Sequence, residues 1–573
     1  MTLSTHSNWY LGAGRAKAAE ALGQVWDAQT LRAFLRFNFP NDQLIVASQR
    51  QPYSHSKTVG GARWAMPASG LVTAMAPVMK ACAGTWVAHA TGDADAEVVD
   101  EEGVWITPSD AGAYRLKRLW FNEQDQSGHL DGFSNSGLWP LCHESNLGGT
   151  CTSPVQPHFT EDSWTRYRRV NQAYADAIVE ESSCANPLVM VHDYQLSLVP
   201  GLVRKQLPQA TIIAFWHIPW ASHSQMSLCP WLDELIAGWL GSDVVGFQTP
   251  RHRDNFLEAV RLLGGRPTVG NTRAVVGTGH TSHVGHYPVS VAWPSEHTNV
   301  CKISSEPVSR RLKLIVGIDR FDYTKGLLER LKALEVLLLV YPEWTGRVRL
   351  VQVAAPTRGA LPAYEKYRAE VQTEVLRINT RFSSGDWQPV TLLDTHHDPD
   401  EVNALYRAAD VCLVTSLQDG MNLVCKEFIA ARADESGVLV LSTFAGASDE
   451  LTSALPVNPL NPDEVASALH QALTMPETEV RRRMRELRRN VEKNNVHRWA
   501  ASLFADAARS RLAQATSQVA GVRLPTESAN PHHGRVGNVY TLDKPLKLST
   551  LDGDVRRKKR VAGTVTAPGR AGL

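Results

Sequence analysis

Residues 312–339 read LKLIVGIDRFDYTKGLLERLKALEVLLL, which is a short apolar run, a turn and a longer segment of helical period. The run 312–320 is apolar on both faces, as is typical of a strand buried inside a parallel sheet. The turn after it carries Arg320 and Lys325, and Gly326 stands directly before the helical segment. We therefore predict a strand, a cationic turn and a helix, the repeating unit of an α/β protein.

The same pattern recurs in two series along the chain. A Gly-, Thr- and His-rich stretch without helical period separates the two. The pattern predicts two doubly wound α/β domains, 44–305 and 306–494, that face each other. The apolar runs are 44–48, 187–194, 210–220 and 243–250 in the first series, and 312–320, 348–356, 410–417 and 437–444 in the second.

The two ends of the chain differ from this pattern. We expect an N-terminal leader at 1–43, and a helix at 495–514 that crosses back to the first domain with an apolar stripe at Trp499 and Leu503. Residues 515–573 form a basic segment with few large apolar side chains, so a disordered tail is expected. No apolar targeting segment is present, which favours the cytoplasm; export by a non-classical route through the acid-poor leader is the alternative.

The composition excludes several classes of partner. The chain has 573 residues with 43% hydrophobic positions, and its 59 Lys and Arg nearly balance its 58 Asp and Glu. A net charge of +1 gives no global field that would attract nucleic acid or a membrane surface, and no apolar stretch is long enough to span a bilayer. We therefore expect small-molecule ligands, bound by local charge, in a monomer or a homo-oligomer.

A metal site and a nicotinamide site are not expected. The eight cysteines show no C-x-x-C pair, and His280, His283 and His286 lack accompanying carboxylates. The glycine pattern G-x-G-x-x-G of dinucleotide-binding enzymes is absent as well. The sequence thus predicts reduced thiols and no bound cofactor.

The cationic turn at 320–325 is a candidate phosphate site. In open α/β sheets, ligands bind beyond the carboxyl ends of the strands, near the helix N-termini. There Arg320 can bind two oxygens of a diphosphate in a fork, and Lys325 can add a mobile point charge. The alternative is an ion pair of Arg320 with Asp319 or Asp322, beside a lysine that faces solvent.

A second candidate turn follows the run 410–417. It reads QDGMNL over 418–423, and a helix that contains Glu427 comes next. Gly420 would let a ligand approach the backbone, the amides at the helix start would bind phosphate or sugar oxygens, and Glu427 would bind two ribose hydroxyls. The alternative is that Asp419 caps the helix and that Glu427 lies on its surface.

Two strand ends of the first domain carry polar groups suited to sugars. His217 follows the run 210–216, and His192 with Asp193 ends the run before it. A neutral histidine and an aspartate commonly bind sugar hydroxyls, although a single histidine at a strand end is more often structural. Their pairing with the cationic turns of the other domain favours a carbohydrate site.

Seven longer motifs carry a resemblance to a known family. Together they resemble the retaining glycosyltransferases of family 20, the trehalose-6-phosphate synthase family, from about residue 44 to 512. The resemblance implies the GT-B fold, in which two Rossmann-like domains hold the active site between them. The motifs, in chain order, are FSNSGLWPLCH at 133–143, HDYQL at 192–196, HIPW at 217–220, GFQT at 246–249, DRFDYTKGL at 319–327, APTRG at 355–359 and DGMNLVCKEF at 419–428.

The resemblance also implies a reaction and a set of roles. Glucose would pass from UDP-glucose to glucose 6-phosphate with retention, giving trehalose 6-phosphate and UDP without a metal ion. The implied catalytic set is Arg320, Lys325, His217 and Asp193. The implied donor contacts are Gly70, Asp419, Met421, Asn422, Leu423 and Glu427. The implied acceptor contacts are Arg50, Trp139, Asp193 and Arg358.

Departures from the family pattern fall at the acceptor end. His89 stands where an aromatic Trp is usual, Leu130 replaces a Tyr nine residues before the motif Trp139, and Gln195 replaces the second His of the usual HDYHL. Two alternatives follow. One is a glucosylglycerol-phosphate synthase that uses glycerol 3-phosphate, and the other is a non-catalytic sugar-phosphate sensor. The donor nucleotide, UDP rather than GDP or ADP, is an expectation from the resemblance alone.

Overall fold

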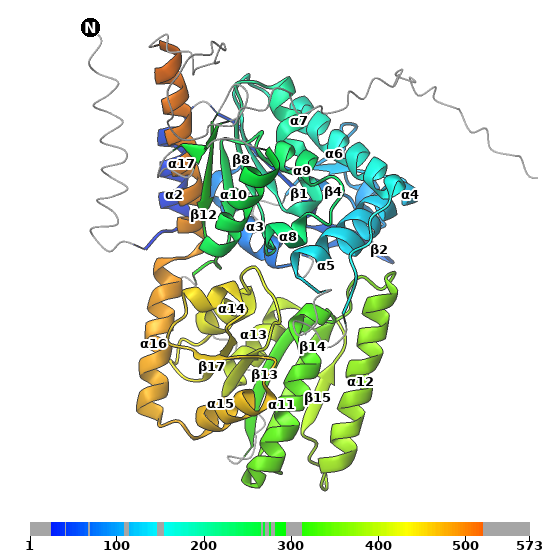
Figure 1. Ribbon diagram of the computed structural model, residues 1–573, viewed down its shortest axis with the longest axis vertical. Coiled ribbons are helices and arrows are strands. Elements are labelled where there is room, and N and C mark those ends of the chain that lie inside the picture. The colour runs from blue at the N-terminus through cyan, green and yellow to red at the C-terminus, as the bar shows by residue number, and fades with distance from the viewer. Residues whose placement is uncertain are drawn as a thin grey trace, which may run out of the picture.

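The computed structural model describes most of the chain between residues 25 and 519. The described residues are 25–40, 42–66, 69–107, 114–145, 154–264, 268–269, 274–276, 281–293 and 312–519. The start of the predicted leader, the predicted domain boundary and the predicted tail beyond residue 519 lie outside these ranges. Within them, two open sheets covered by helices form two halves, one above the other in Figure 1.

The first sheet has ten strands in the order β10-β11-β12-β9-β8-β7-β1-β4-β6-β5. Every neighbouring pair from β12 to β6 is parallel, and only the edge pairs are antiparallel. The strands are β1 (Leu44–Arg50), β4 (Thr85–His89), β5 (Val104–Ile106), β6 (Arg115–Leu119), β7 (Leu188–His192), β8 (Thr211–Phe215), β9 (Val244–Phe247), β10 (Thr268–Val269), β11 (Ala274–Val276) and β12 (Thr281–His286). A separate hairpin comprises β2 (Ser54–Thr58) and β3 (Gly61–Ala65).

The second sheet is parallel throughout, with the order β15-β14-β13-β16-β17-β18. Its strands are β13 (Lys313–Arg320), β14 (Val348–Ala355), β15 (Val390–Leu393), β16 (Val411–Val414), β17 (Val438–Ser442) and β18 (Leu455–Val457). Neighbouring residues of β13 point to opposite faces. Ile315 belongs to the core under one group of helices and Val316 to the core under the other, so helices cover both faces.

Both sheets have the strand order of dinucleotide-binding folds. Counted along the chain, β15 to β18 read 3-2-1-4-5-6, and the run β6-β4-β1-β7-β8-β9 of the first sheet reads the same. The order reverses between β13 and β16 in one half and between β1 and β7 in the other. At such a switch point, neighbouring loops lead away to opposite faces and leave room for a ligand. All the apolar runs quoted from the sequence contain strands of these parallel regions, as predicted.

The helices follow the strands in the expected alternation. In the first half they are α2 (Ala28–Asn38), α3 (Gly70–Cys82), α4 (Glu123–Ser127), the π-helix η3 (Gly128–Leu138), α5 (Trp139–Cys142), α6 (Glu161–Glu181), α7 (Val199–Gln206), α8 (His223–Met226), α9 (Leu232–Trp239) and α10 (Pro250–Gly264). In the second they are α11 (Leu327–Val340), α12 (Pro362–Phe382), α13 (Pro399–Ala408), α14 (Leu423–Ala431), α15 (Pro462–Thr474) and α16 (Glu477–Lys493), followed by α17 (Val496–Val519). Short 3-10 turns join several of them.

Helices α2 and α17 lie together on the first half. Leu31 and Leu35 of α2 are buried against α3 and α17, so this part of the predicted leader is packed into the first half. Helix α17 covers β8 and β9 with Trp499 and Leu503 buried, and it runs to Val519, five residues past the predicted end at 514. The end of such a helix is hard to locate from sequence, because residues 513–519 (AQATSQV) contain neither a proline nor a glycine that would stop it.

The chain passes between the halves at two neighbouring places. One passage follows β12 and includes Val289 and Val291, and the other joins α16 to α17. The amide of Val496 donates to the carbonyl of Val291 at 2.9 Å, so the two passages are hydrogen-bonded to each other. Lys426 of α14 donates to the carbonyl of Val289 at 2.8 Å. Figure 1 shows α16 along one side of the lower half, continuing into α17 beside the upper half.

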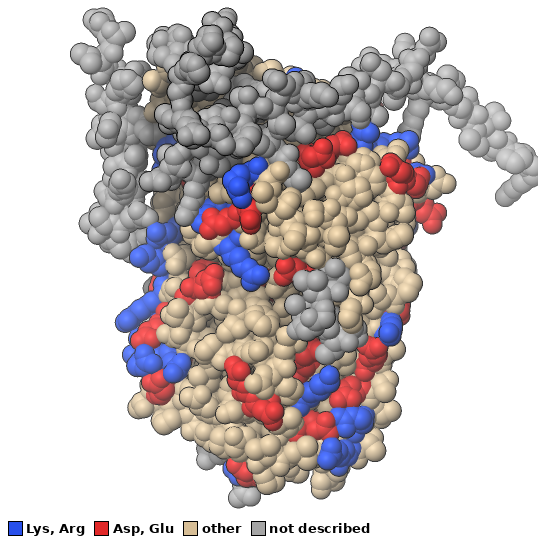
Figure 2. Space-filling model, in the orientation of Figure 1, with Lys and Arg blue, Asp and Glu red and all other residues tan. Residues whose placement is uncertain are grey.

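Charges of both signs are mixed on the molecular surface. On the face shown in Figure 2, Lys and Arg side chains alternate with Asp and Glu rather than gathering into one large patch. On α16, Arg482 pairs with both Glu479 and Glu486. Among the described residues, no helix combines the length and the apolar character that crossing a membrane requires.

Candidate active site

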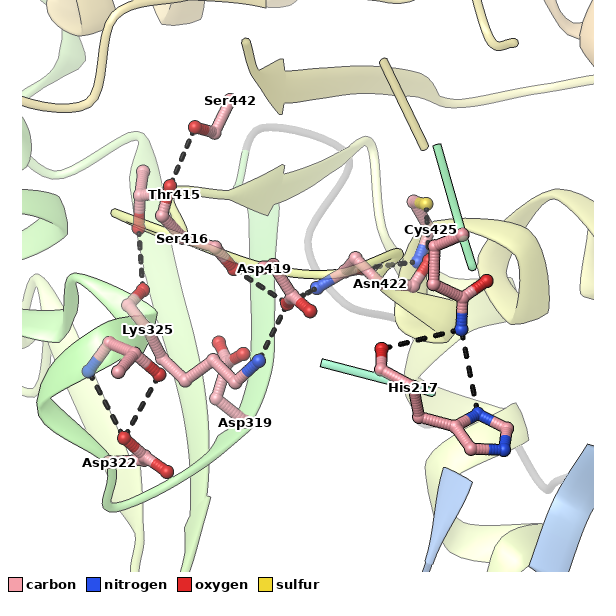
Figure 3. Close-up of polar contacts among 12 residues, drawn as sticks. His217, Asp319, Asp322, Lys325, Thr415, Ser416, Asp419, Asn422, Cys425 and Ser442 are labelled. Carbon is pink, nitrogen blue, oxygen red and sulfur yellow. Dashed lines mark hydrogen bonds and ion pairs between the residues drawn. The ribbon is translucent and has the colours of Figure 1, made fainter. Parts of the chain in front are cut away.

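The turn after β13 brings Lys325 to Asp419. The Nζ of Lys325 lies 2.6 Å from Oδ2 of Asp419, which also accepts hydrogen bonds from Ser416 Oγ and Asn422 Nδ2, both at 3.2 Å (Figure 3). The Lys325 side chain is only 13% exposed, so the alternative of a lysine that faces solvent is contradicted. Because the three donors reach one oxygen of Asp419, the other oxygen is the one available to a ligand in the described part of the chain.

The ion-pair alternative for Arg320 is also contradicted. Asp319 pairs with Arg330 at 2.8 Å, and Asp322 pairs with Arg358 at 3.0 Å. Both carboxylates expected as partners are thus engaged by other arginines. The guanidinium of Arg320 lies instead 5.9 Å from the centre of the Trp139 ring, across the junction of the two halves.

For the turn after β16, the alternative was that Asp419 caps the helix and that Glu427 lies on its surface. The structure contradicts both parts. Asn422, with a φ of 83°, caps α14 by accepting a hydrogen bond from the amide of Cys425 at 3.1 Å, so the cap is not Asp419. Glu427 is not a surface group, because its Oε2 accepts from the hydroxyl of Tyr406 at 3.0 Å. Burial raises the pKa of Glu427 to about 7. Asp419 fails as a cap because it turns toward Lys325 instead.

The first half touches this turn at two places. A Cβ on Gly420 would collide with the carbonyl oxygen of His217, so only glycine permits this approach of the two backbones. At the start of α3, a Cβ on Gly70 would lie 3.4 Å from the Leu423 side chain. The buried Met421 lies between these two contacts in sequence. The predicted donor residues of both halves are therefore brought together.

His217 is held by its neighbours on β7 and β9. Its Nε2 lies 2.9 Å from Nδ1 of His192, and its Nδ1 faces the amide nitrogen of Gln248 at 3.5 Å. Burial, with His192 nearby, lowers the pKa of His217 well below its ordinary value. The imidazole is therefore neutral, with one nitrogen that donates and one that accepts, as recognition of a sugar hydroxyl requires.

Asp193 occupies an unusual backbone conformation at the end of β7. Its φ of 72° and ψ of 168° fall in a region that is essentially reserved for glycine, and holding another residue there costs about 1–3 kcal/mol. The carboxylate accepts from the amide of His217 at 3.1 Å. Burial raises the pKa of Asp193 to about 7. The strained backbone therefore places, at the switch point of the first sheet, a carboxyl group that changes its protonation state near neutral pH.

Three guanidinium groups crowd the junction of the halves. Arg358 stacks 3.8 Å from the centre of the Trp139 ring and donates to the hydroxyl of Tyr194 at 3.3 Å. Loss of solvent, together with the charges of Arg320 and Arg358, lowers the pKa of Arg50 to about 10. Trp139 keeps a buried Nε1 without a hydrogen-bond partner in the described structure. This cluster is suited to an anion, and it contains three of the four predicted acceptor residues, namely Arg50, Trp139 and Arg358.

The residues that depart from the family pattern at the acceptor end lie near this cluster: His89 is paired with Arg50 between β4 and β1, Leu130 precedes Trp139 by nine residues, and Gln195 follows Tyr194. His89 is buried at the end of β4 and contacts Phe121 at 5.2 Å between ring centres; burial lowers its pKa to about 4. Leu130 is half-buried in η3. The carbonyl of Gln195 accepts from His129 at 2.9 Å. All three residues lie in the first half, in or directly after β4, η3 and β7.

Some residues at the site were not singled out from the sequence. Tyr406 on α13 binds Glu427, yet nothing in the sequence of α13 indicates this contact. Tyr194 and Gln248 stand inside quoted motifs, so their neighbourhood could have indicated them. Of the three histidines rejected as metal ligands, His280 lies outside the described residues. Across the described ranges, no three His, Cys, Asp or Glu side chains gather as a metal-binding group.

The family follows from a comparison with known proteins. The model of Glycosyltransferase family 20 matches residues 42–509. The chain belongs to this family. A trehalose-6-phosphate synthase of Mycobacterium bovis is 36% identical over 506 residues, covering 84% of this chain and 96% of that protein. An alpha,alpha-trehalose-phosphate synthase [UDP-forming] of Schizosaccharomyces pombe is 34% identical over 477 residues, covering 81% and 90%.

Solved structures agree with this family 20 assignment. A protein from E. coli bound with UDP-2-fluoro glucose has a TM-score of 0.71 and 31% identity, covering 82% of this chain and 99% of its own. An alpha,alpha-trehalose-phosphate synthase (UDP-forming) from Burkholderia xenovorans, in complex with glucose-6-phosphate, has a TM-score of 0.70 and 29% identity, covering 81% and 99%. The predicted GT-B arrangement of two Rossmann-like domains is thereby confirmed.

Proposed function

We propose that this family 20 enzyme transfers glucose from UDP-glucose to glucose 6-phosphate with retention, forming trehalose 6-phosphate and UDP. The observation that carries the proposal is the cluster of Arg50, Arg320 and Arg358 where the switch points of the two sheets meet. Such an excess of positive charge suits two phosphate-bearing substrates in one place. The relatives bound with a UDP-sugar and with glucose 6-phosphate support the same pair of substrates.

On the donor side, we assign Arg320 and Lys325 to the diphosphate and Glu427 to the ribose. The partial burial of Lys325 strengthens its interaction with an anion, and Glu427 presents a carboxyl group from the middle of α14. His217 and the free oxygen of Asp419 would bind hydroxyls of the glucose. The backbone around Met421, Asn422 and Leu423, with Gly70 opposite, would lie against the phosphates and the sugar.

The chemistry follows from where charge develops. The bond between C1 of glucose and the phosphate oxygen breaks, and the acceptor hydroxyl forms the new bond on the same face. Its proton passes to the departing phosphate, so no separate base is assigned. Negative charge grows on the UDP during this step, and Arg320 and Lys325 stabilise it more in the transition state than in the ground state.

On the acceptor side, Arg50 and Arg358 would bind the phosphate of glucose 6-phosphate. The ring of Trp139 orients Arg358, and its free Nε1 adds a donor. Asp193 would accept from a hydroxyl of the acceptor sugar. We further propose that no metal ion takes part, since these cations supply the positive charge. Full activity in EDTA and no gain from added magnesium are the expected results.

The decisive measurement is UDP release by the purified full-length chain. We expect release with UDP-glucose and glucose 6-phosphate, a product with the mass of trehalose 6-phosphate, and a loss of about 100-fold in turnover for Arg320→Ala. Turnover with glycerol 3-phosphate alone would instead favour the glucosylglycerol-phosphate alternative. Binding of both substrates without UDP release would favour the sensor. Cytoplasmic location and a homo-oligomeric state are proposed with the reaction, and sizing of the native protein tests the latter.

A further inference from the structure

Arg330 is a fully buried arginine beneath the diphosphate turn. It lies on α11 with 0% of its side chain exposed. Its Nε donates to Thr415 Oγ1 at 3.0 Å, and its Nη1 donates to Gln352 Oε1 at 2.6 Å. Its Nη2 pairs with Asp319 at 2.8 Å. One guanidinium therefore joins α11 to β13, β14 and the end of β16, the strands around the switch point.

Thr415 links Arg330 to the turn that carries Lys325. Its hydroxyl donates to the carbonyl of Gly326 at 3.0 Å. It also approaches the carbonyl of Lys325 at 3.4 Å (Figure 3). Arginine has only donors, so Thr415 must accept from Arg330. The single hydroxyl hydrogen of Thr415 is then directed at the turn. Arg330 thus fixes the direction of the hydrogen bond that holds the turn.

The turn is also tightly packed against this hydroxyl group. Gly326 has a φ of 65°, and a Cβ there would collide with the carbonyl of Thr415. The backbone of Lys325 and Gly326 therefore cannot move toward β16, and the Thr415 hydroxyl prevents movement away. The position of Lys325 depends on this pair of constraints.

The ion pair with Asp319 adds an electrostatic constraint. The side chain of Asp319 is 4% exposed, and its carboxylate interacts with both Arg330 and Lys325. Burial raises the pKa of Asp319, and the two cations counter that rise. Without Arg330, Asp319 would have Lys325 as its remaining cation and would draw it away from Asp419.

We propose that Arg330 is a positioning residue for the donor diphosphate. It acts through Thr415, which holds the turn, and through Asp319, which it keeps from competing for Lys325. This inference rests on the proposed role of Lys325. It assigns no contact with substrate to Arg330, which lies inside the domain behind the turn.

The first test removes only the hydroxyl. Thr415→Val keeps the shape of the side chain, and we expect UDP affinity, measured by calorimetry, to fall about tenfold. Thr415→Ser keeps the hydroxyl and should bind UDP as the wild type does. Ser282→Ala is the matched control, since it removes a buried hydroxyl that donates to loop carbonyls at 2.7 and 3.1 Å far from the turn. It should change stability without changing UDP affinity.

A double-mutant cycle with Lys325→Ala separates positioning from general damage. If Thr415 acts through Lys325, then Thr415→Val should have no further effect on UDP affinity in the Lys325→Ala background. Equal losses in both backgrounds would overturn this inference and leave the proposed function intact. If Lys325→Ala alone binds UDP normally, the assigned diphosphate role fails, and the inference fails with it.

Arg330 itself is tested with its charge partner removed. Arg330→Met alone would leave Asp319 unpaired in the interior and is expected to destabilise the fold. The pair Arg330→Met and Asp319→Asn removes both charges, and it should lower UDP affinity about as much as Thr415→Val does. Adding Thr415→Val to this double variant should then change the UDP affinity little. Wild-type UDP affinity in the folded pair would overturn the positioning role of Arg330.

Discussion

At the scale of single residues, the site combines groups whose pKa values are shifted by burial. Glu427 and Asp193 both have a pKa of about 7, raised by burial, while burial keeps His217 neutral. Such shifts make ionisation near neutral pH depend on what binds beside the group. A carboxyl group that is hard to ionise when the site is empty gains from a ligand that donates hydrogen bonds to it.

The raised pKa of Glu427 predicts how stability depends on pH. The folded protein holds this proton up to about pH 7, whereas the unfolded chain loses it near the ordinary value of 4.5. Between these values the folded state binds more protons, so the stability contributed by Glu427 falls as pH rises. In Glu427→Gln this loss is removed, and the Tm difference from the wild type should grow in favour of the variant from about pH 5 to pH 8. A pH-independent difference would contradict the assigned shift.

Arg358 predicts a difference between arginine and lysine. Lysine keeps the positive charge but loses the planar face that stacks at 3.8 Å on Trp139. Arg358→Lys should therefore raise the KM for glucose 6-phosphate by about tenfold while UDP affinity stays unchanged. Arg347→Lys is a suitable control because Arg347 lies over Trp344 at 5.8 Å, away from the site. An equal rise in both variants would refute the acceptor role.

At the scale of elements, the turns after β13 and β16 do most to build the site. They could be predicted, since long apolar runs end directly before Arg320 and Asp419, and the strand order then places both turns at the switch point. The strands β4, β15 and β18 were not predicted, and length alone does not account for this, since β4 is as long as the predicted β7. The π-helix η3 was missed too. The hydroxyl of Ser134 donates to the carbonyl of His129, a local contact that no hydrophobic pattern reveals.

Candidate residues can be named from the sequence, whereas the residues that contact them cannot. Motifs indicate which side chains matter, but a contact such as Tyr406 with Glu427 or Tyr194 with Arg358 depends on how distant segments pack. For the same reason, the sequence could not decide that Arg330 would take Asp319. Burial selects the partner here, because an enclosed carboxylate requires the nearest cation.

The N-cap residue of α14, Asn422, is expected to contribute to stability through both its side chain and its backbone conformation. Asn422 contributes a side-chain cap and tolerates a φ of 83°. Asn422→Ala loses both advantages, whereas Asn422→Gly loses only the side chain. We expect the alanine variant to unfold at a lower urea concentration than the glycine variant, with a total loss of about 1–2 kcal/mol or more for alanine. The reverse order would mean that backbone strain at this position is unimportant.

At the scale of the whole molecule, the ligand is expected to act on both halves at once. The proposed donor residues come from each half, so UDP binding should stabilise the folded chain by mass action, by about 2.7 kcal/mol at about a hundredfold excess over Kd. Differential scanning calorimetry should show a higher Tm with UDP, and Lys325→Ala should lose most of that rise. A rise of equal size in the variant would remove Lys325 from the donor site.

The hydrogen bond between Val496 and Val291 connects the two places at which the chain passes between the halves. Val496 is the first residue of α17, so this contact lies where α16 gives way to α17, along one side of the molecule (Figure 1). A rotation of one half against the other about this contact would move the chain least here and most at places far from it. The stack of Arg358 on Trp139 joins the two halves where the switch points of the sheets meet, so such a rotation would pull these two side chains apart.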